Sequence, residues 1–116
     1  MITDNAIWNE VFKYTFYFST GSEEDFVDEY NDIADDEEKE ATGRSGYCLS
    51  DNASEYVYLY IKSVKDLGAV SHEVFHAVST CLSHRGITPQ SEDGEETYAY
   101  MVEWLTNRIL EVNNGS

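Results

Sequence analysis

Two stretches of alternating side chains constrain the fold of this chain most strongly. Residues 11–18 read VFKYTFYF, and residues 56–62 read YVYLYIK. A period of two in aromatic and β-branched residues is typical of β-strands, because successive side chains of a strand point to opposite faces of its sheet. A third, shorter strand is expected at residues 47–49. The turn residues Asp51 and Asn52 follow it, so it should form a hairpin with residues 56–62.

Three other segments repeat their apolar residues at intervals of three and four, which predicts helices. These helices are expected over residues 23–38, from about Val70 to the Arg85-Gly86 pair, and from about Glu92 to Val112. Gly86 suits the left-handed cap that ends many helices. The buried side of the second helix is expected to hold Val74, Phe75, Val78, Cys81 and Leu82. That of the third is expected to hold Tyr98, Met101, Val102, Leu105, Ile109 and Val112.

The order strand, helix, strand, strand, helix, helix predicts an α+β fold with a small, about three-stranded sheet. The 116 residues suffice for one domain with its own core, spanning residues 1–116. Cys48 and Cys81 match neither a disulfide framework nor a C-x-x-C motif, so both are expected to be buried free thiols.

Negative charge is concentrated near the start of the chain. The formal net charge is −16, and eleven of the 23 acidic residues lie between Glu23 and Glu40. We expect an acidic helix and loop over residues 22–45, and no binding of nucleic acid, because such a surface repels phosphates. A second hypothesis follows from the same charge: a non-enzymatic acidic inhibitor that mimics DNA and occupies a nucleic-acid-binding host protein.

No apolar run approaches the roughly 20 residues of a membrane span, and the chain does not open with a signal-type segment. We therefore expect no membrane association and a cytoplasmic location.

The motif His72-Glu73-Val74-Phe75-His76 lies within the second predicted helix. Residues four apart project from one helix face, so two imidazoles at this spacing can bind a single ion. Zinc favours nitrogen and oxygen ligands, and a catalytic zinc site activates water for hydrolysis. Glu73 would then act as the general base. The pattern predicts a zinc site on this helix.

A third ligand is required, and the sequence leaves several candidates. His84 follows His76 by eight residues, which places it about 12 Å along the helix axis and on another side. The metzincin pattern would require glycine and histidine where this chain has Ser79 and Leu82, so that class is excluded. The last helix offers carboxylates instead: Glu92, Asp93, Glu95, Glu96 and Glu103. Glu96 could alternatively form a capping box with Asp93.

HEVFHA at residues 72–77, followed by the E-x-x-A motif at residues 96–99, resembles the gluzincin arrangement of ImmA/IrrE-type domains. The chain is still more similar to small HExxH proteins encoded by bacteriophages. Gly86-Ile87, Ala99-Tyr100 and Trp104-Leu105 match their pattern, and the resemblance covers roughly residues 56–112. Where ImmA/IrrE domains continue with Asn and then Phe-Ala, this chain has Tyr100 and then Val102-Glu103. The repressor cleavage of that family is therefore not carried over.

The resemblance implies a zincin-like metallopeptidase domain with its metal site within residues 70–104. It assigns His72, His76 and Glu96 as zinc ligands, with Glu95 competing for the third place, and Glu73 as the base. The expected activity is hydrolysis of a peptide bond in a peptide or protein substrate, in the cytoplasm of a bacterial host. By analogy, an edge strand (residues 47–50 or 56–62) would pair with extended substrate. Tyr98 or Tyr100 would stabilise the oxyanion.

Overall fold

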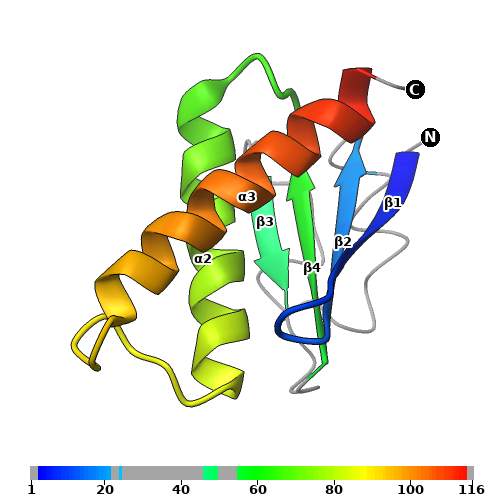
Figure 1. Ribbon diagram of the computed structural model, residues 1–116. Coiled ribbons are helices and arrows are strands. Elements are labelled where there is room, and N and C mark those ends of the chain that lie inside the picture. Colours follow the sequence, from blue (N-terminus) through cyan, green and yellow to red (C-terminus); the bar gives the residue numbers. More distant parts are fainter. Residues whose placement is uncertain (1–2, 22–23, 25–45, 50–54, 115–116) are drawn as a thin grey trace.

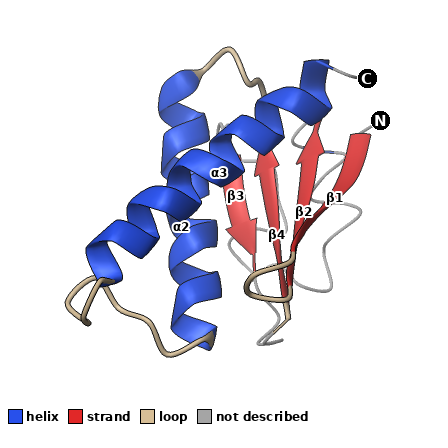
Figure 2. Cartoon of the chain, in the orientation of Figure 1, coloured by secondary structure: helices blue, strands red, loops and turns tan. Residues whose placement is uncertain are grey.

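A mixed β-sheet with two helices on one of its faces makes up the described part of the protein (Figure 1). The computed structural model describes residues 3–21, 24, 46–49 and 55–114. Figure 2 shows that both helices lie on the same side of the sheet, which gives the two-layer α+β arrangement that the sequence predicts. In chain order the elements are β1 (Thr3–Asn9), β2 (Tyr14–Thr20), β3 (Gly46–Leu49), β4 (Tyr56–Ile61), α2 (Leu67–His84) and α3 (Gly94–Asn114).

The sheet has the strand order β1-β2-β4-β3. The predicted hairpin of β3 and β4 is present and antiparallel, β2 and β4 are parallel, and β1 pairs antiparallel with β2. All three predicted strands are present, and β1 joins them as a fourth that the sequence did not reveal. Its residues include Asp4, Asn5 and Asn9, which have low strand propensity, and Ile7 is its only fully buried apolar side chain. Pairing along its whole length with β2 makes it a strand.

β2 begins at Tyr14, three residues later than the alternation at 11–18 predicts, because a turn occupies residues 10–13. The side-chain oxygen of Asn9 accepts a hydrogen bond from the Phe12 N–H (2.8 Å), and Lys13 has a φ of 52°. Arg85, just after α2, donates to the carbonyls of Phe12 (2.8 Å) and Lys13 (3.0 Å). This turn is therefore tied to the end of α2.

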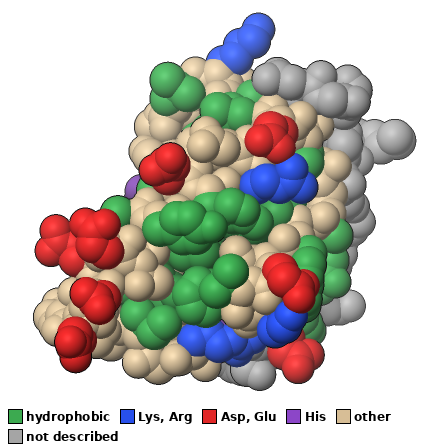
Figure 3. All heavy atoms as spheres, in the orientation of Figure 1, with side chains coloured by type: hydrophobic (Ala, Val, Ile, Leu, Met, Phe, Trp, Pro, Cys, Tyr) green, Lys and Arg blue, Asp and Glu red, His purple; other side chains and the backbone are tan. Residues whose placement is uncertain are grey.

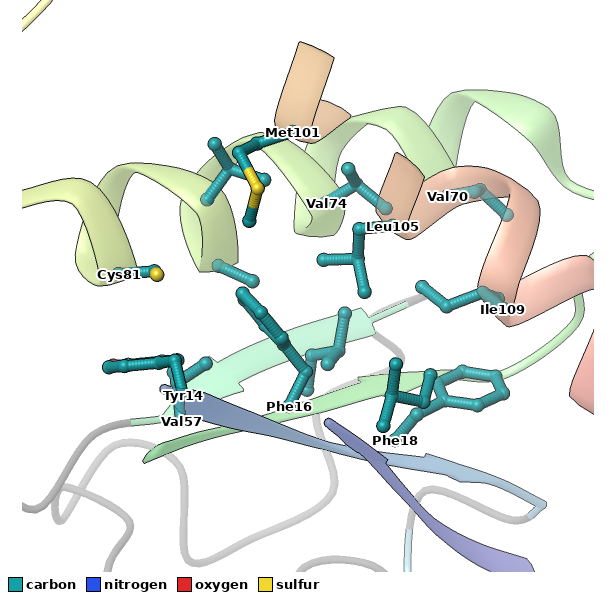
Figure 4. Packing of buried hydrophobic residues seen from close by; sticks show 14 of the residues in the cluster. Tyr14, Phe16, Phe18, Val57, Val70, Val74, Cys81, Met101, Leu105 and Ile109 are labelled. Carbon is teal, nitrogen blue, oxygen red and sulfur yellow. The ribbon is translucent and has the colours of Figure 1, made fainter. Parts of the chain in front are cut away.

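The core lies between the sheet and the two helices (Figure 4). Alternation in β2 and β4 turns Tyr14, Phe16, Phe18, Val57, Leu59 and Ile61 towards the helices, which contribute Val70, Val74, Ala77, Val78, Cys81, Leu82, Met101, Leu105 and Ile109. Both cysteines are free thiols, as predicted, but only Cys81 is buried, and Cys48 is partly exposed. Burial raises the pKa of the Cys81 thiol to about 12.

One predicted core residue of α2 is wrong. Phe75 is 52% exposed, whereas Glu73 is buried at 6% exposure. Val70, Val74, Ala77 and Cys81 recur at intervals of four and three, so they set the buried stripe. Phe75 lies about 100° around the helix from Val74, on the flank of this stripe, and Glu73 lies on the opposite flank.

Helix α2 ends as its sequence predicts. Gly86 has a φ of 74°, and the N–H groups of Gly86 and Ile87 donate to the carbonyls of Ser83 (3.1 Å) and Leu82 (2.9 Å). These are the two bonds of a Schellman cap, which satisfy carbonyls that the helix itself leaves unpaired. The helix begins at Leu67, slightly before the predicted start, because the Asp66 carboxylate accepts the N–H of Ala69 (3.1 Å) and caps its first turn.

The predicted helix at 23–38 and the acidic segment 22–45 lie outside the described residues, Glu24 excepted. Neither of the described helices is apolar enough along its length to cross a bilayer.

Gly94 fixes the position at which α3 begins, and its replacement by alanine is expected to be costly. A Cβ atom there would lie 2.0 Å from the carbonyl oxygen of Thr88 and 2.8 Å from Oγ of Ser91. We expect Gly94→Ala to lower the free energy of unfolding by about 3 kcal/mol, measured by urea denaturation, because the loop or the helix has to move.

Gly68→Ala provides the matched control for this experiment. A Cβ at position 68 meets only the Asp66 carboxylate, at 3.5 Å, and the site lies in the exposed first turn of α2. Alanine should raise stability here by about 0.5–1 kcal/mol through its helix propensity. Equal stabilities of the Gly94→Ala variant and the wild type would contradict the described connection between the helices.

Candidate metal centre

His72 and His76 lie side by side on the solvent-facing side of α2. Their ring centroids are 4.8 Å apart, the rings are inclined by 73°, and both residues are exposed. This proximity follows from their spacing of four residues on one helix. The structure brings together the two histidines that the sequence predicts as ligands, and leaves both open to solvent.

Glu73 leaves α2 about 100° around the helix from His72 and lies against the strand β3. A Cβ atom on Gly46, the first residue of β3, would lie 2.6 Å from Cγ of Glu73 and 2.8 Å from its Oε2. The buried carboxylate therefore occupies the space between α2 and β3, the last strand in the order of the sheet. The predicted base thus lies beside a strand that was expected to receive substrate.

The third histidine, His84, is placed away from this pair and packs against the sheet. Its Nδ1 is hydrogen-bonded to the hydroxyl of Tyr14 (3.0 Å), which also donates to the carbonyl of Tyr56 (3.1 Å). The guanidinium of Arg85 lies over the Tyr14 ring, 5.3 Å from its centroid. These contacts give His84 a structural role at the end of α2.

Two aromatic residues connect the histidine pair with α3. The ring centroid of Phe75 is 6.3 Å from that of His76 and 6.5 Å from that of Tyr98. The second turn of α3 therefore lies next to the pair, with Phe75 between them. Of the two tyrosines considered for the oxyanion, Tyr98 is the one at this contact, whereas Tyr100 is 55% exposed on another side of α3.

The carboxylates at the start of α3 do not complete a site with the histidines. Glu95 and Glu96 are both exposed in the first turn of α3, and acidic side chains gather over this end of the helix and the loop before it (Figure 3). Within the described ranges, no three His, Cys, Asp or Glu side chains form a metal-binding group. His72, His76 and Glu96 are therefore not assembled as a ligand set.

Helix phase distinguishes the two carboxylates. Glu95 precedes Tyr98 by three residues and the partly buried Val102 by seven, which places it on the side of α3 that faces α2. Glu96 shares its side with Ala99, Tyr100 and Glu103, all of which are exposed. Ala99 is exposed, so this small residue does not mediate a close contact between the two helices.

Gly46 is a residue of this region that the sequence did not reveal. The sequence of residues 43–46 predicts a loop, because nothing in it distinguishes a glycine that begins a four-residue strand from a glycine within a loop. A glycine at the start of a strand can also signal the close approach of another group. Here that group is Glu73.

Comparison with known proteins gives no match to a family model, to a curated protein or to a solved structure.

The geometry predicts that replacing His72 or His76 affects zinc binding, whereas replacing His84 affects stability. We expect His72→Ala and His76→Ala each to abolish zinc binding measured by isothermal titration calorimetry, while changing stability by less than about 0.5 kcal/mol, because both side chains are exposed. His84→Ala should bind zinc as the wild type does but lose about 1 kcal/mol of stability with its hydrogen bond to Tyr14. Unchanged zinc affinity in the first two variants would contradict the assignment.

Proposed function

We propose that this protein is a zinc-dependent metallopeptidase that hydrolyses a peptide bond in a peptide or protein substrate. The supporting observation is the division of α2 into three faces. One face holds two histidines whose rings are 4.8 Å apart, the next holds a buried glutamate against β3, and the third forms the core. Two imidazoles and one adjacent carboxylate are the groups that metal-assisted hydrolysis requires from such a helix.

Each residue of the motif has a separate role in this proposal. His72 and His76 hold the metal through one ring nitrogen each. Zinc bound there would lower the pKa of a water molecule and polarise the scissile carbonyl. Glu73 accepts the proton of the attacking water and transfers it to the leaving amine. Packing of its side chain over Gly46 limits the positions that the carboxylate can take.

β3 is the element best placed to bind an extended substrate. Among the described strands it pairs only with β4 and stands at the end of the sheet, and Glu73 lies over its first residue. A peptide added along this edge would be held by main-chain hydrogen bonds with its backbone close to Glu73. The proposed substrate is therefore an extended segment rather than a folded surface.

The third ligand is proposed to come from the first turn of α3. The E-x-x-A motif favours Glu96, whereas the helix phase favours Glu95, which lies on the side of α3 that carries Tyr98. Glu96 lies about 100° further around the helix, so it would reach the histidines only if α3 rotated. Without such a rotation, Glu95 is the proposed third ligand, and its side chain would have to move towards the histidines to complete the site.

Replacement of Glu73 by glutamine tests the proposed base. Glutamine keeps the shape of the buried side chain but cannot accept the proton, so Glu73→Gln should bind one zinc per chain and lower kcat by at least about 100-fold. Hydrolysis of an unfolded protein substrate measures the rate, and metal analysis measures the zinc. Glu103→Gln, an exposed carboxylate of α3, serves as the control and should be fully active. Wild-type activity in Glu73→Gln would exclude Glu73 as the base.

The two carboxylates of α3 can be ranked by competition with a chelator. Loss of a ligand weakens zinc binding far more than loss of a surface carboxylate. We expect Glu95→Gln to release zinc at a lower chelator concentration than Glu96→Gln, with Glu92→Gln and Glu103→Gln as surface controls. The reverse order would show that α3 rotates to present Glu96 as the E-x-x-A motif implies. Equal retention in all four variants would exclude a third ligand from this region.

A further inference from the structure

Gly46 lies at a position where no side chain would fit. A Cβ atom there would lie 2.6 Å from Cγ of Glu73, 2.8 Å from its Oε2 and 2.9 Å from the carbonyl oxygen of Tyr60. Nonbonded carbon and oxygen atoms do not approach this closely at low energy, because attraction between heavy atoms is optimal at about 3.5–4.0 Å. Any residue other than glycine therefore forces a displacement.

Backbone conformation does not explain this glycine. Gly46 pairs with Ile61 in a regular antiparallel register, and the described glycines with positive φ are Gly21 and Gly86. A glycine within a strand weakens it, since glycine loses more conformational freedom on folding than other residues. The space that Gly46 leaves for its neighbours is thus the physical reason for its presence.

Of the atoms around Gly46, those of Glu73 would meet the added Cβ most closely, and the Tyr60 carbonyl oxygen, at 2.9 Å, would also have to shift. Helix α2 is held on the sheet by buried side chains before and after this residue, among them Val70 and Val74. It therefore cannot rise to make room for a methyl group without opening the core. The Tyr60 carbonyl belongs to β4, the neighbour of β3 in the sheet. The Glu73 side chain can rotate away at lower cost.

We propose that Gly46 is a positioning residue that holds the Glu73 carboxylate in place for catalysis. This inference rests on the proposed function, in which Glu73 is the base. Gly46 touches neither metal nor substrate in this role. Its lack of a side chain leaves room for Glu73 between the helix that carries the histidines and the strand proposed to bind substrate.

Gly46→Ala is expected to impair catalysis without weakening the binding of zinc or substrate. The added methyl group displaces the base and leaves His72 and His76 unchanged. Gly46→Ala should therefore retain zinc with the wild-type chelator midpoint, keep KM within about twofold and lower kcat at least tenfold, since base catalysis depends on close geometry. Gly68→Ala, in which the Cβ meets only Asp66 at 3.5 Å, should retain the wild-type kcat. A wild-type kcat in Gly46→Ala would overturn the inference.

A double-mutant cycle tests the contact itself and does not depend on activity. Gly46→Ala should lower the folding equilibrium constant at least tenfold in the wild type, measured by urea denaturation. In a Glu73→Ala background the loss should be at least threefold smaller, because the methyl group then enters the space that Glu73 has left and only the contact with the Tyr60 carbonyl remains. An equal loss in both backgrounds would overturn the inference and assign the glycine to the Tyr60 carbonyl.

The cycle remains decisive if Gly46→Ala does not fold. A folded Gly46→Ala, Glu73→Ala double variant would then support the inference, and an unfolded double variant would overturn it. The proposed function fails separately: a wild-type protein that binds no zinc and hydrolyses no peptide would refute it, whatever the cycle shows.

Discussion

The burial of one stripe of α2 against the sheet determines where the chemical groups of this protein lie. Val70, Val74, Ala77 and Cys81 are buried in the core, and this fixes the rotation of the helix about its axis. With the rotation fixed, His72 and His76 face solvent and Glu73 faces β3. The proposed site is thus a consequence of core packing.

Packing also explains why the two histidines of the motif differ in their cost to the fold from its buried glutamate. A pair of exposed histidines costs the fold little, and their exchange for alanine should be tolerated. A buried carboxylate is costly unless it is hydrogen-bonded or paired with an opposite charge. Gly46 provides the space that the Glu73 side chain occupies. That a charged residue is held at this position, where an apolar one would pack more simply, is the structural feature most consistent with a chemical role for Glu73.

The sequence predicted those parts of the fold that depend on local patterns. The alternation in β2 and β4, the stripe of α2 and the Gly86 cap all have a short-range signal, and all are present. β1 was missed because its strand conformation comes from pairing with β2 rather than from its own residues. Phe75 was misplaced because its apolar character does not show which flank of α2 is buried. The buried flank is that of Glu73, which lies against β3.

For the candidate site, the same distinction between local and tertiary information applies. The pairing of His72 with His76 follows from their spacing alone, so the sequence is enough to predict it. The choice between Glu95 and Glu96 depends on the rotation of α3, which is set by Met101, Leu105 and Ile109 several residues away. The contact of Gly46 with Glu73 joins residues 27 positions apart and depends on the packing of α2 over β3. Neither the choice between Glu95 and Glu96 nor the contact of Gly46 with Glu73 could be predicted from a sequence motif.

Anomalous scattering at the zinc absorption edge, from crystals grown with zinc, would show directly whether the proposed metal site exists. We expect one zinc ion per chain, bound at about 2.0–2.1 Å by a ring nitrogen of His72 and of His76, with a carboxylate oxygen from the first turn of α3 of the same chain. Zinc that is absent from this face of α2, or that is held there only between two different chains, would contradict the proposed site.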